Sequence, residues 1–219
     1  MALPTYLELV NDVMVRLREP EVTTVQANTL SKLIGKLVND SKRQVEDAYN
    51  WSALTNTINI TTVADTYQYT LTGSGNRFRP YAARNVSKLV DMTNAPVISI
   101  EGMLAATTIP QKGAPTFYCF KGIDSVGDAK IEVFPIPDNG YSLSFDLYIP
   151  TNTLVNDSDV VKVPSEPIVA GAYARALVER GEDGGLNSSE AYALYRGVLA
   201  DYIANEASRF VEGGSWEAV

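Results

Sequence analysis

The sequence predicts an α+β protein in which the two chain ends form a four-helix bundle and an antiparallel β-rich domain is inserted between them. Near both ends, apolar residues recur every three to four positions, the spacing of amphipathic helices. In the middle they alternate with polar residues, as in half-buried strands. Neither helical pair can bury its apolar stripe alone, so we expect the pairs to pack together. The predicted limits are 1–54 and 164–211 for the bundle, 55–163 for the insert and 212–219 for a C-terminal tail.

Two helices are expected at the N-terminal end. The first runs from about Pro4 to Arg18, and Thr5 and Glu8 have the spacing of a capping box, in which each side chain satisfies a free backbone N–H. The second runs from about Thr29 to Trp51. Gly35 lies inside it at a cost of about 1 kcal/mol relative to alanine, so we expect Gly35 to mark the close approach of another helix.

The middle of the chain is expected to form strands. The clearest is Tyr141–Ile149, in which aromatic and aliphatic residues occupy every second position. We expect one antiparallel pair between Thr57–Thr61 and Thr66–Leu71, and a hairpin through residues 135–140 that joins Tyr141–Ile149 to the strand before it. Residues 103–115 have no sustained period and are expected to be a long loop. Further strands are predicted at Asn85–Val90, Pro96–Ile100, Thr116–Phe120 and Lys130–Phe134.

Two helices are expected at the C-terminal end. Ser165 is the expected N-cap of the first, and glycines after Arg180 end it. Asn187 and Glu190 have capping-box spacing at the start of the second, which runs to about Phe210. Its apolar stripe is predicted to contain Ala191, Leu194, Val198, Tyr202 and Ile203.

The composition excludes several function classes. The 219 residues contain 26 acidic and 18 basic side chains, a net charge of −8, which argues against affinity for a phosphate backbone. There is no histidine, so His-based triads and imidazole metal sites are excluded. The single cysteine, Cys119, excludes an internal disulfide and a cysteine-cluster metal site. With no apolar run near the length of a membrane span, we expect a soluble intracellular protein without cofactor or metal that is not an enzyme.

Four features have both a functional and a structural interpretation. Gly73 and Gly75 follow a predicted strand but lack the rest of a phosphate-loop motif, so we interpret them as a plain hairpin turn. Asp124–Asp128 lacks the alternating ligands of a calcium loop and is interpreted as a surface turn. Cys119 has no histidine to activate it and is interpreted as a buried thiol. The acidic residues Glu179, Glu182 and Asp183 are interpreted as a solvated turn.

Aromatic residues mark the candidate interfaces. One short segment combines two arginines with two aromatic residues, and in the absence of a wider basic stripe it favours a protein partner over nucleic acid. A lone tryptophan after Gly-Gly-Ser in the tail has no core to fill and suggests a docking arm that inserts into a neighbour. The candidate partner-interface residues are Arg77, Phe78, Arg79, Tyr81, Phe210 and Trp216.

Four stretches resemble the head-to-tail adaptor (connector) proteins of tailed bacteriophages. They are residues 16–24, 38–51, 66–80 and 171–185, and the last, GAYARALVERGEDGG, is similar to the tail tubular protein A group of short-tailed phages. The resemblance implies a helical bundle with an inserted β domain and a ring, typically of twelve copies, below the portal.

The resemblance also implies a function. Such a ring joins the portal protein to the tail nozzle or tail tube, closes the DNA-filled head, and leaves a channel through which DNA passes without specific binding. We therefore expect a protein of the virion neck that is assembled in the host cytoplasm. The alternatives are another neck or tail-completion protein, a hydrolase that uses Glu179 or Asp183 with Asp201, and a nucleic-acid-binding protein.

Overall fold

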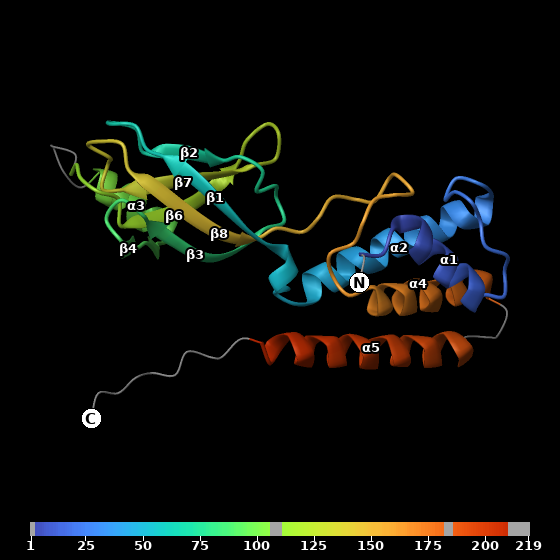
Figure 1. Ribbon diagram of the computed structural model, residues 1–219. Helices are drawn as coiled ribbons and strands as arrows, with labels where there is room; N and C mark the ends of the chain where they lie inside the picture. Colours follow the sequence, from blue (N-terminus) through green and yellow to red (C-terminus); the bar gives the residue numbers. More distant parts are fainter. Residues whose placement is uncertain (1–2, 106–110, 182–185, 210–219) are drawn as a thin grey trace, which may run out of the picture. The chain divides into compact units, whose positions relative to one another are not determined.

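The computed structural model describes residues 3–105, 111–181 and 186–209 (Figure 1). The chain divides into two compact units, which we call the helical unit (Met1–Leu54 and Pro150–Val219) and the β unit (Thr55–Ile149). The described residues form five α-helices and two four-stranded sheets, so the α+β class is confirmed. Residues 150–163 pack with the helices, although the sequence had placed them in the insert.

The N-terminal helices begin where the sequence predicts. In α1 (Tyr6–Arg16), the backbone N–H of Thr5 donates to Glu8 Oε2 at 2.7 Å, and Glu8 N–H donates to Thr5 Oγ1 at 3.3 Å, which confirms the capping box. In α2 (Thr29–Ala48), a Cβ atom on Gly35 would lie 2.8 Å from Val25 Cγ1 and would also clash with the hydroxyl of Tyr6 on α1. Gly35 therefore marks the close approach of another helix, as expected.

α4 (Ser165–Arg180) has an unexpected start and the expected end. Its N-cap is Pro164, which makes no side-chain capping bond, so Ser165 is the first helical residue and not the cap. Gly181 ends the helix in the left-handed conformation, with φ of 62°, which favours a residue without Cβ.

α5 (Leu186–Ala207) buries most of the predicted stripe, including Ala191, Tyr202 and Ile203, but not Leu194. Tyr195 is 1% exposed whereas Leu194 is 62% exposed, so the predicted stripe was wrong at Leu194. Apolar residues occur on all sides of α5, and α4 decides which of them is buried. Gly171 of α4 leaves room for the ring of Tyr195, since a Cβ atom there would lie 3.1 Å from Tyr195 Cε2. Asn187, the predicted capping residue, falls within the helix, and Phe210 lies outside the described residues.

Helices from both chain ends share one hydrophobic core. α4 packs against α1, α2 and α5, and its buried face meets side chains from each of them. Whether the four helices form a regular four-helix bundle stays a prediction. The core includes Leu9, Val13, Ile34, Val38, Val45, Leu154, Val161, Ile168, Ala172 and Tyr195.

Residues 150–163, which we call the return segment, contain no helix or regular strand and pack with the helices. The side chain of Asn39 on α2 donates to Leu154 O at 3.0 Å and accepts from Leu154 N–H at 2.9 Å. Near the other end of the segment, Val160 forms an isolated antiparallel bridge with Thr5. Polar groups of the helical unit thus bond backbone groups of the return segment that no sheet satisfies. These bonds hold the segment to the helical unit.

The β unit consists of two sheets with a common core (Figure 1). The first is antiparallel, in the order β1 (Thr55–Thr61), β8 (Ser142–Tyr148), β3 (Arg79–Asn85), β4 (Val90–Asp91). The second has the order β2 (Gln68–Leu71), β7 (Ala129–Phe134), β6 (Phe117–Ile123), β5 (Thr93–Asn94). Its β5–β6 pair is parallel, so the insert is not purely antiparallel as expected. Leu143, Phe145 and Leu147 face the core from β8, which confirms the alternation predicted for this strand.

Both predicted strand pairings were wrong. β1 and β2 lie in different sheets, and so do β7 and β8. The connections 62–67 and 135–141 each cross from one sheet to the other. The two connections bond to each other instead, because Thr62 N–H donates to Tyr141 O at 2.9 Å and Asp65 N–H donates to Pro137 O at 2.8 Å.

Three local predictions in the β unit were also wrong. Residues 96–100 do not form a strand, because α3 (Val97–Ala105) begins after Pro96, and its Ile100 is completely buried against β6 and β7. Proline suits the start of a helix, and the β-branched residues that follow suggested a strand. Part of the expected loop 103–115 is therefore helical. The predicted strand at 85–90 is interrupted by a turn at 86–89, in which Leu89 has φ of 56°, between the end of β3 and the start of β4.

Candidate interface surfaces

The predicted basic–aromatic cluster lies at the start of β3. Phe78 is half-buried and packs on the core of the β unit, with its ring centroid 5.0 Å from that of Phe120. Arg77 is exposed and Arg79 is half-buried. Phe78 therefore anchors this segment to the sheet, and the exposed part of the cluster is narrower than the sequence suggested.

Tyr81 is the most exposed aromatic residue of the cluster. Its side chain is 62% exposed, and its ring stands edge-on to that of Tyr148 with centroids 5.5 Å apart. The register between β3 and β8 shifts between Pro80 and Ala82, so Tyr81 is the extra residue of a β-bulge. Bulges redirect a side chain away from the regular alternation. Here the bulge presents a large aromatic ring to solvent.

Sequence reasoning missed several exposed apolar side chains on the last two helices. Val178 of α4 and Leu194 of α5 are 65% and 62% exposed. Close to Val178, Tyr192 of α5 is half exposed and lines a hollow of about 360 Å³ between the helices. The signal in the sequence was the apolar character of α5 on all sides, which exceeds what one buried face needs. The hollow is lined by Ala174, Arg175, Val178, Ser188, Ser189 and Tyr192.

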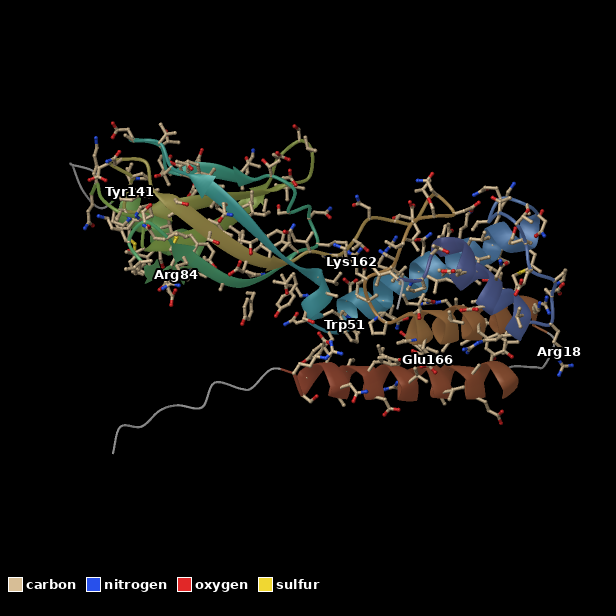
Figure 2. All side chains as sticks on the ribbon, viewed as in Figure 1. Arg18, Trp51, Arg84, Tyr141, Lys162 and Glu166 are labelled. Atoms are coloured by element: carbon tan, nitrogen blue, oxygen red, sulfur yellow. The ribbon has the colours of Figure 1, made fainter. Side chains whose placement is uncertain are left out.

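A hydrogen bond and a wide cavity mark the opposite end of these helices. Glu166 lies in the first turn of α4 (Figure 2). The hydroxyl of Tyr202 on α5 donates to Glu166 Oε2 at 2.9 Å. Beside it lies a cavity of about 770 Å³ whose lining includes Trp51, Lys162 and Arg209. Phe210 and Trp216, the other predicted interface residues, follow Arg209 in the chain but lie outside the described residues.

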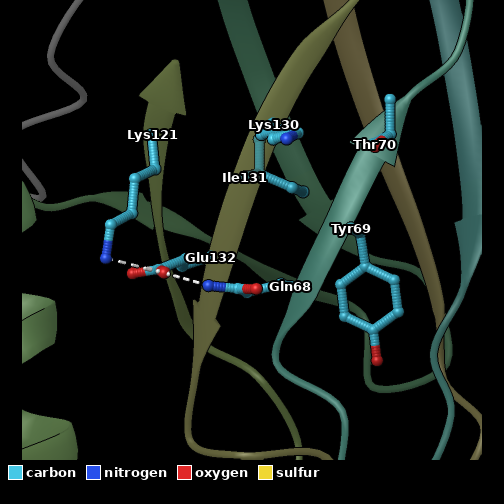
Figure 3. A pocket seen from close by; sticks show the side chains of 7 residues that line it. All are labelled: Gln68, Tyr69, Thr70, Lys121, Lys130, Ile131 and Glu132. Carbon is cyan, nitrogen blue, oxygen red and sulfur yellow. Dashed lines mark hydrogen bonds and ion pairs between the residues drawn. The ribbon is translucent and has the colours of Figure 1, made fainter. Parts of the chain in front are cut away.

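A polar pocket of about 410 Å³ lies on the outer face of the second sheet (Figure 3). Lys121 Nζ lies 2.8 Å from Glu101 Oε1 and 2.9 Å from Glu132 Oε1, and Gln68 Nε2 donates to the same Glu132 oxygen at 2.7 Å. Glu132 is 1% exposed. Hydrogen bonds to Glu101 and then to Glu132 raise the pKa of Lys121. The lysine is therefore protonated at neutral pH and holds an ion pair, a poor state for a general base or a nucleophile.

The glycine and aspartate motifs are structural turns that bind each other. Asp128 accepts hydrogen bonds from the backbone N–H groups of Gly73 at 2.9 Å and Gly75 at 3.0 Å. Asp124 Oδ1 accepts three N–H groups of its own loop, those of Val126, Gly127 and Asp128. The anion at the two glycines is thus a carboxylate of the same chain. The Gly73–Gly75 turn connects strands of different sheets, so it is not the hairpin turn that the sequence predicted.

The remaining reactive side chains do not line these pockets. Cys119 is 1% exposed, and burial, followed by the charge of Glu132, raises the pKa of its thiol. Glu179 and Asp201 are both exposed, while Glu182 and Asp183 lie outside the described residues. In the part of the chain that the structure describes, no group of three or more Cys, Asp or Glu side chains is placed to hold a metal ion.

The surfaces described above do not identify the family of this protein, but a comparison with family models does. Residues 4–215 match the family model described as SU10 adaptor protein. The chain belongs to the SU10 adaptor protein family. The match confirms the resemblance to phage head-to-tail adaptors that the sequence stretches indicated. No curated protein matches the chain.

Membership in the SU10 adaptor family directs attention to surfaces rather than to pockets. An adaptor works by contacts with other virion components, and large exposed apolar side chains are the usual anchors of such contacts. In this family member they occur in both units, at Tyr81 in the β unit and at Val178, Tyr192 and Leu194 in the helical unit. Among the described residues, no helix is long and apolar enough to cross a membrane.

Proposed function

We propose that this SU10 adaptor is a virion structural protein that forms a ring of twelve copies between the portal and the tail nozzle or tail tube. The ring closes the DNA-filled head and leaves a channel for DNA ejection. The observation that carries the proposal is the family match over residues 4–215. The net charge of −8 supports it, because an acidic wall repels DNA phosphate and allows DNA to slide without specific binding.

We propose the basic–aromatic cluster as one contact of this adaptor. Arg77, Arg79 and Tyr81 supply the contact, and Phe78 fixes their segment by packing against Phe120. Aromatic and arginine side chains are enriched at the centres of protein interfaces, where they are often energetic hot spots. The cations also suit an acidic surface on a partner.

We propose a second contact in the C-terminal tail, through Phe210 and Trp216. A tryptophan buries a large area at low entropic cost when it enters a pocket of another subunit. The helices of both chain ends, as one four-helix bundle, supply the rigid part from which the tail extends. Their shared hydrophobic core supports this arrangement.

Native mass spectrometry with the matching portal ring tests the adaptor role. The purified protein is measured alone and after mixing with the portal. We expect a complex with one copy of this chain per portal subunit. Absence of any association, at every salt concentration, would contradict portal binding.

Another neck or tail-completion protein of the same virion is the second candidate. Exposed apolar side chains in both units, such as Leu89 and Val178, favour contact with more than one partner and are compatible with a different position in the neck. A pull-down with tail components separates the two roles, since this second role predicts binding to tail proteins without the portal. Either role places the protein in the virion neck after assembly in the host cytoplasm.

A further inference from the structure

The first sheet of the β unit ends in a long edge strand. β1 pairs with β8 over seven consecutive residues without a register shift, and no strand of the described residues pairs with its other side. The other outermost strands are shorter, with four residues in β2 and two each in β4 and β5. Proteins protect free edges with charges, prolines, bulges or short strands. β1, with the sequence TNTINIT, has none of these.

The register shows which backbone groups of β1 face its free edge. Thr62 N–H, just after β1, donates to Tyr141 O at 2.9 Å, and on the other side of β8 Val86 N–H donates to Ser142 O at 2.8 Å. Hydrogen-bonded pairs recur at every second residue of an antiparallel ladder, so the even-numbered residues of β1 bond to β8. The N–H and C=O groups that face the free edge belong to Thr55, Thr57, Asn59 and Thr61.

Two apolar side chains lie incompletely covered at this edge. Ile58 and Ile60 pack against the core of the β unit from β1, but both are only half-buried. A strand added beside β1 would pair the free backbone groups and cover these two side chains at the same time. The edge therefore offers both components of strand addition, hydrogen bonds and apolar burial.

We propose that β1 pairs in an antiparallel manner with β1 of a second copy of this chain, about a two-fold axis at Ile58. In this register Thr57 lies opposite Asn59 of the second copy, and Thr55 lies opposite Thr61, so that all outward backbone groups are paired. Ile58 lies opposite itself, and Asn56 lies opposite Ile60. The result is one continuous sheet across the two β units.

Charge favours a second copy as the occupant of the edge. Each chain has a net charge of −8, so two copies repel each other wherever charged surfaces meet. Residues 48–64, which include all of β1, form the longest run in the sequence without a charged side chain. Like charges directly opposite each other destabilise strand pairs, and self-pairing of β1 places none together.

The pairing ends at two copies. The described residues of each chain have one such edge, and a two-fold contact uses the same edge on both copies. Because a two-fold contact cannot connect neighbours that follow one another around a ring, the pair is a state of the protein outside the proposed ring. The β1 pairing can be tested without the portal, so its outcome does not depend on the adaptor role.

Disulfide trapping in the full chain tests the register. The pair at Ile58 is of the type without hydrogen bonds, with Cα atoms about 4.5 Å apart, within the range of a disulfide. Mild oxidation of Ile58→Cys is expected to give a covalent dimer. Ile60→Cys is the matched control, since the same change on the same face places the two cysteines four residues apart along the strands, about 13 Å, beyond disulfide reach. No dimer with Ile58→Cys, or equal dimer with both variants, overturns the proposal.

Sedimentation velocity tests the pairing without relying on cysteine variants. The unmodified protein is expected to show a concentration-dependent dimer. Asn59→Pro removes an outward N–H that β8 does not use and is expected to weaken the dimer at least about tenfold. Asn59→Thr keeps the N–H and is expected to dimerise like the parent. A monomer at all concentrations up to about 100 μM, or a dimer unaffected by Asn59→Pro, contradicts β1 pairing, even if the protein binds the portal.

Discussion

Lys42 and Glu46, one turn apart on α2, form an ion pair of 3.0 Å in which the two side chains are 3% and 1% exposed. Lys42 Nζ also donates to the carbonyl oxygens of Thr151 and Asn152 at 3.0 Å each. Glu46 Oε1 accepts from Thr151 N–H at 3.2 Å and from its hydroxyl at 2.6 Å. The pair therefore holds the start of the return segment to α2.

Removal of the lysine is expected to be costly. Lys42→Met removes the cation that pairs with the buried Glu46 carboxylate and the donor that bonds the carbonyl oxygens of Thr151 and Asn152. Breaking a buried pair from one side costs about 3 to 5 kcal/mol. We expect urea denaturation to show a loss of stability in that range. Lys36→Met, at an exposed position of the same helix, is the control and is expected to change stability by less than about 0.5 kcal/mol.

Substitution of alanine for two helical glycines is expected to change the stability of the protein in opposite directions. A Cβ on Gly35 would lie 2.8 Å from Val25 Cγ1 and would clash with Tyr6, so Gly35→Ala forces α1 and α2 apart. We expect a loss of about 1 to 3 kcal/mol despite the better helix propensity of alanine. Gly197 of α5 has no atom within 4 Å of that position, so Gly197→Ala is expected to gain up to about 1 kcal/mol. Thermal unfolding measures both, and equal signs would contradict this packing.

Glu206 is expected to make stability depend on pH. Its Oε1 accepts from Ser52 N–H at 2.7 Å and from the Ser52 hydroxyl at 2.6 Å, and its Oε2 pairs with Arg209 at 2.9 Å. Burial is the largest influence and raises the pKa of Glu206, but the bonds from Ser52 and the charge of Arg209 together lower it below 4.5. A lowered carboxyl pKa adds stability that is fully present above the unfolded value and is lost as pH falls through the folded value.

Glu206→Gln tests this contribution. At pH 7 we expect the variant to lose about 1 to 2 kcal/mol, because charge-assisted bonds become neutral ones. The difference from the parent is expected to shrink below about pH 4 and to vanish once both proteins carry a neutral group. Denaturant titrations from pH 3 to 7 measure it, with the exposed Glu190→Gln as control. A difference that stays constant with pH would show that the Glu206 charge does not stabilise α5.

Local sequence signals predicted the starts and ends of helices better than they predicted neighbours. The capping box at Thr5 and the stop at Gly181 depend on a few adjacent residues, and both were confirmed. Alternation in β8 identified its buried face, but alternation does not say which strand lies beside it, so both hairpins were wrong. The choice between Leu194 and Tyr195 depends on the space beside Gly171, which α5 alone does not encode.

The sequence predicted which residues make up the basic–aromatic cluster, but not which of their side chains point to solvent. The sequence grouped Phe78 with Tyr81 because both are aromatic and close to arginines. The bulge between Pro80 and Ala82 separates them, so that Phe78 packs inward and Tyr81 is exposed. A bulge depends on the register with β8, which is a tertiary property.

Cys119 is expected to be unreactive in the folded protein. Its side chain is 1% exposed, and burial and then the charge of Glu132 raise the pKa of its thiol. The thiolate is the reactive form, so labelling by a thiol reagent at pH 8 is expected to be at least about 100-fold slower than in urea. Rapid labelling of one thiol per folded chain would contradict this burial. Slow labelling also leaves an engineered cysteine on β1 as the only reactive thiol.

Tyr81 and Phe78 are expected to separate binding from stability. Phe78→Ala removes a ring that packs on the core of the β unit, so we expect a loss of about 2 to 4 kcal/mol in the free energy of unfolding. Tyr81→Ala removes a ring that is 62% exposed and touches Tyr148 at its edge, so we expect a loss below about 1.5 kcal/mol.

Tyr81→Ala is expected to reduce binding to the portal ring more than Phe78→Ala does, the reverse of their effects on stability. Tyr81→Ala is expected to weaken the complex about tenfold or more, because aromatic hot-spot residues that become buried in an interface contribute about 2 kcal/mol or more. Tyr192→Ala, an exposed tyrosine on α5, is the matched control for a change of the same type in the other unit. Equal binding by the parent and Tyr81→Ala, with both proteins folded, would remove the basic–aromatic cluster from the portal contact. Loss of binding with Tyr192→Ala alone would instead place that contact on α4 and α5.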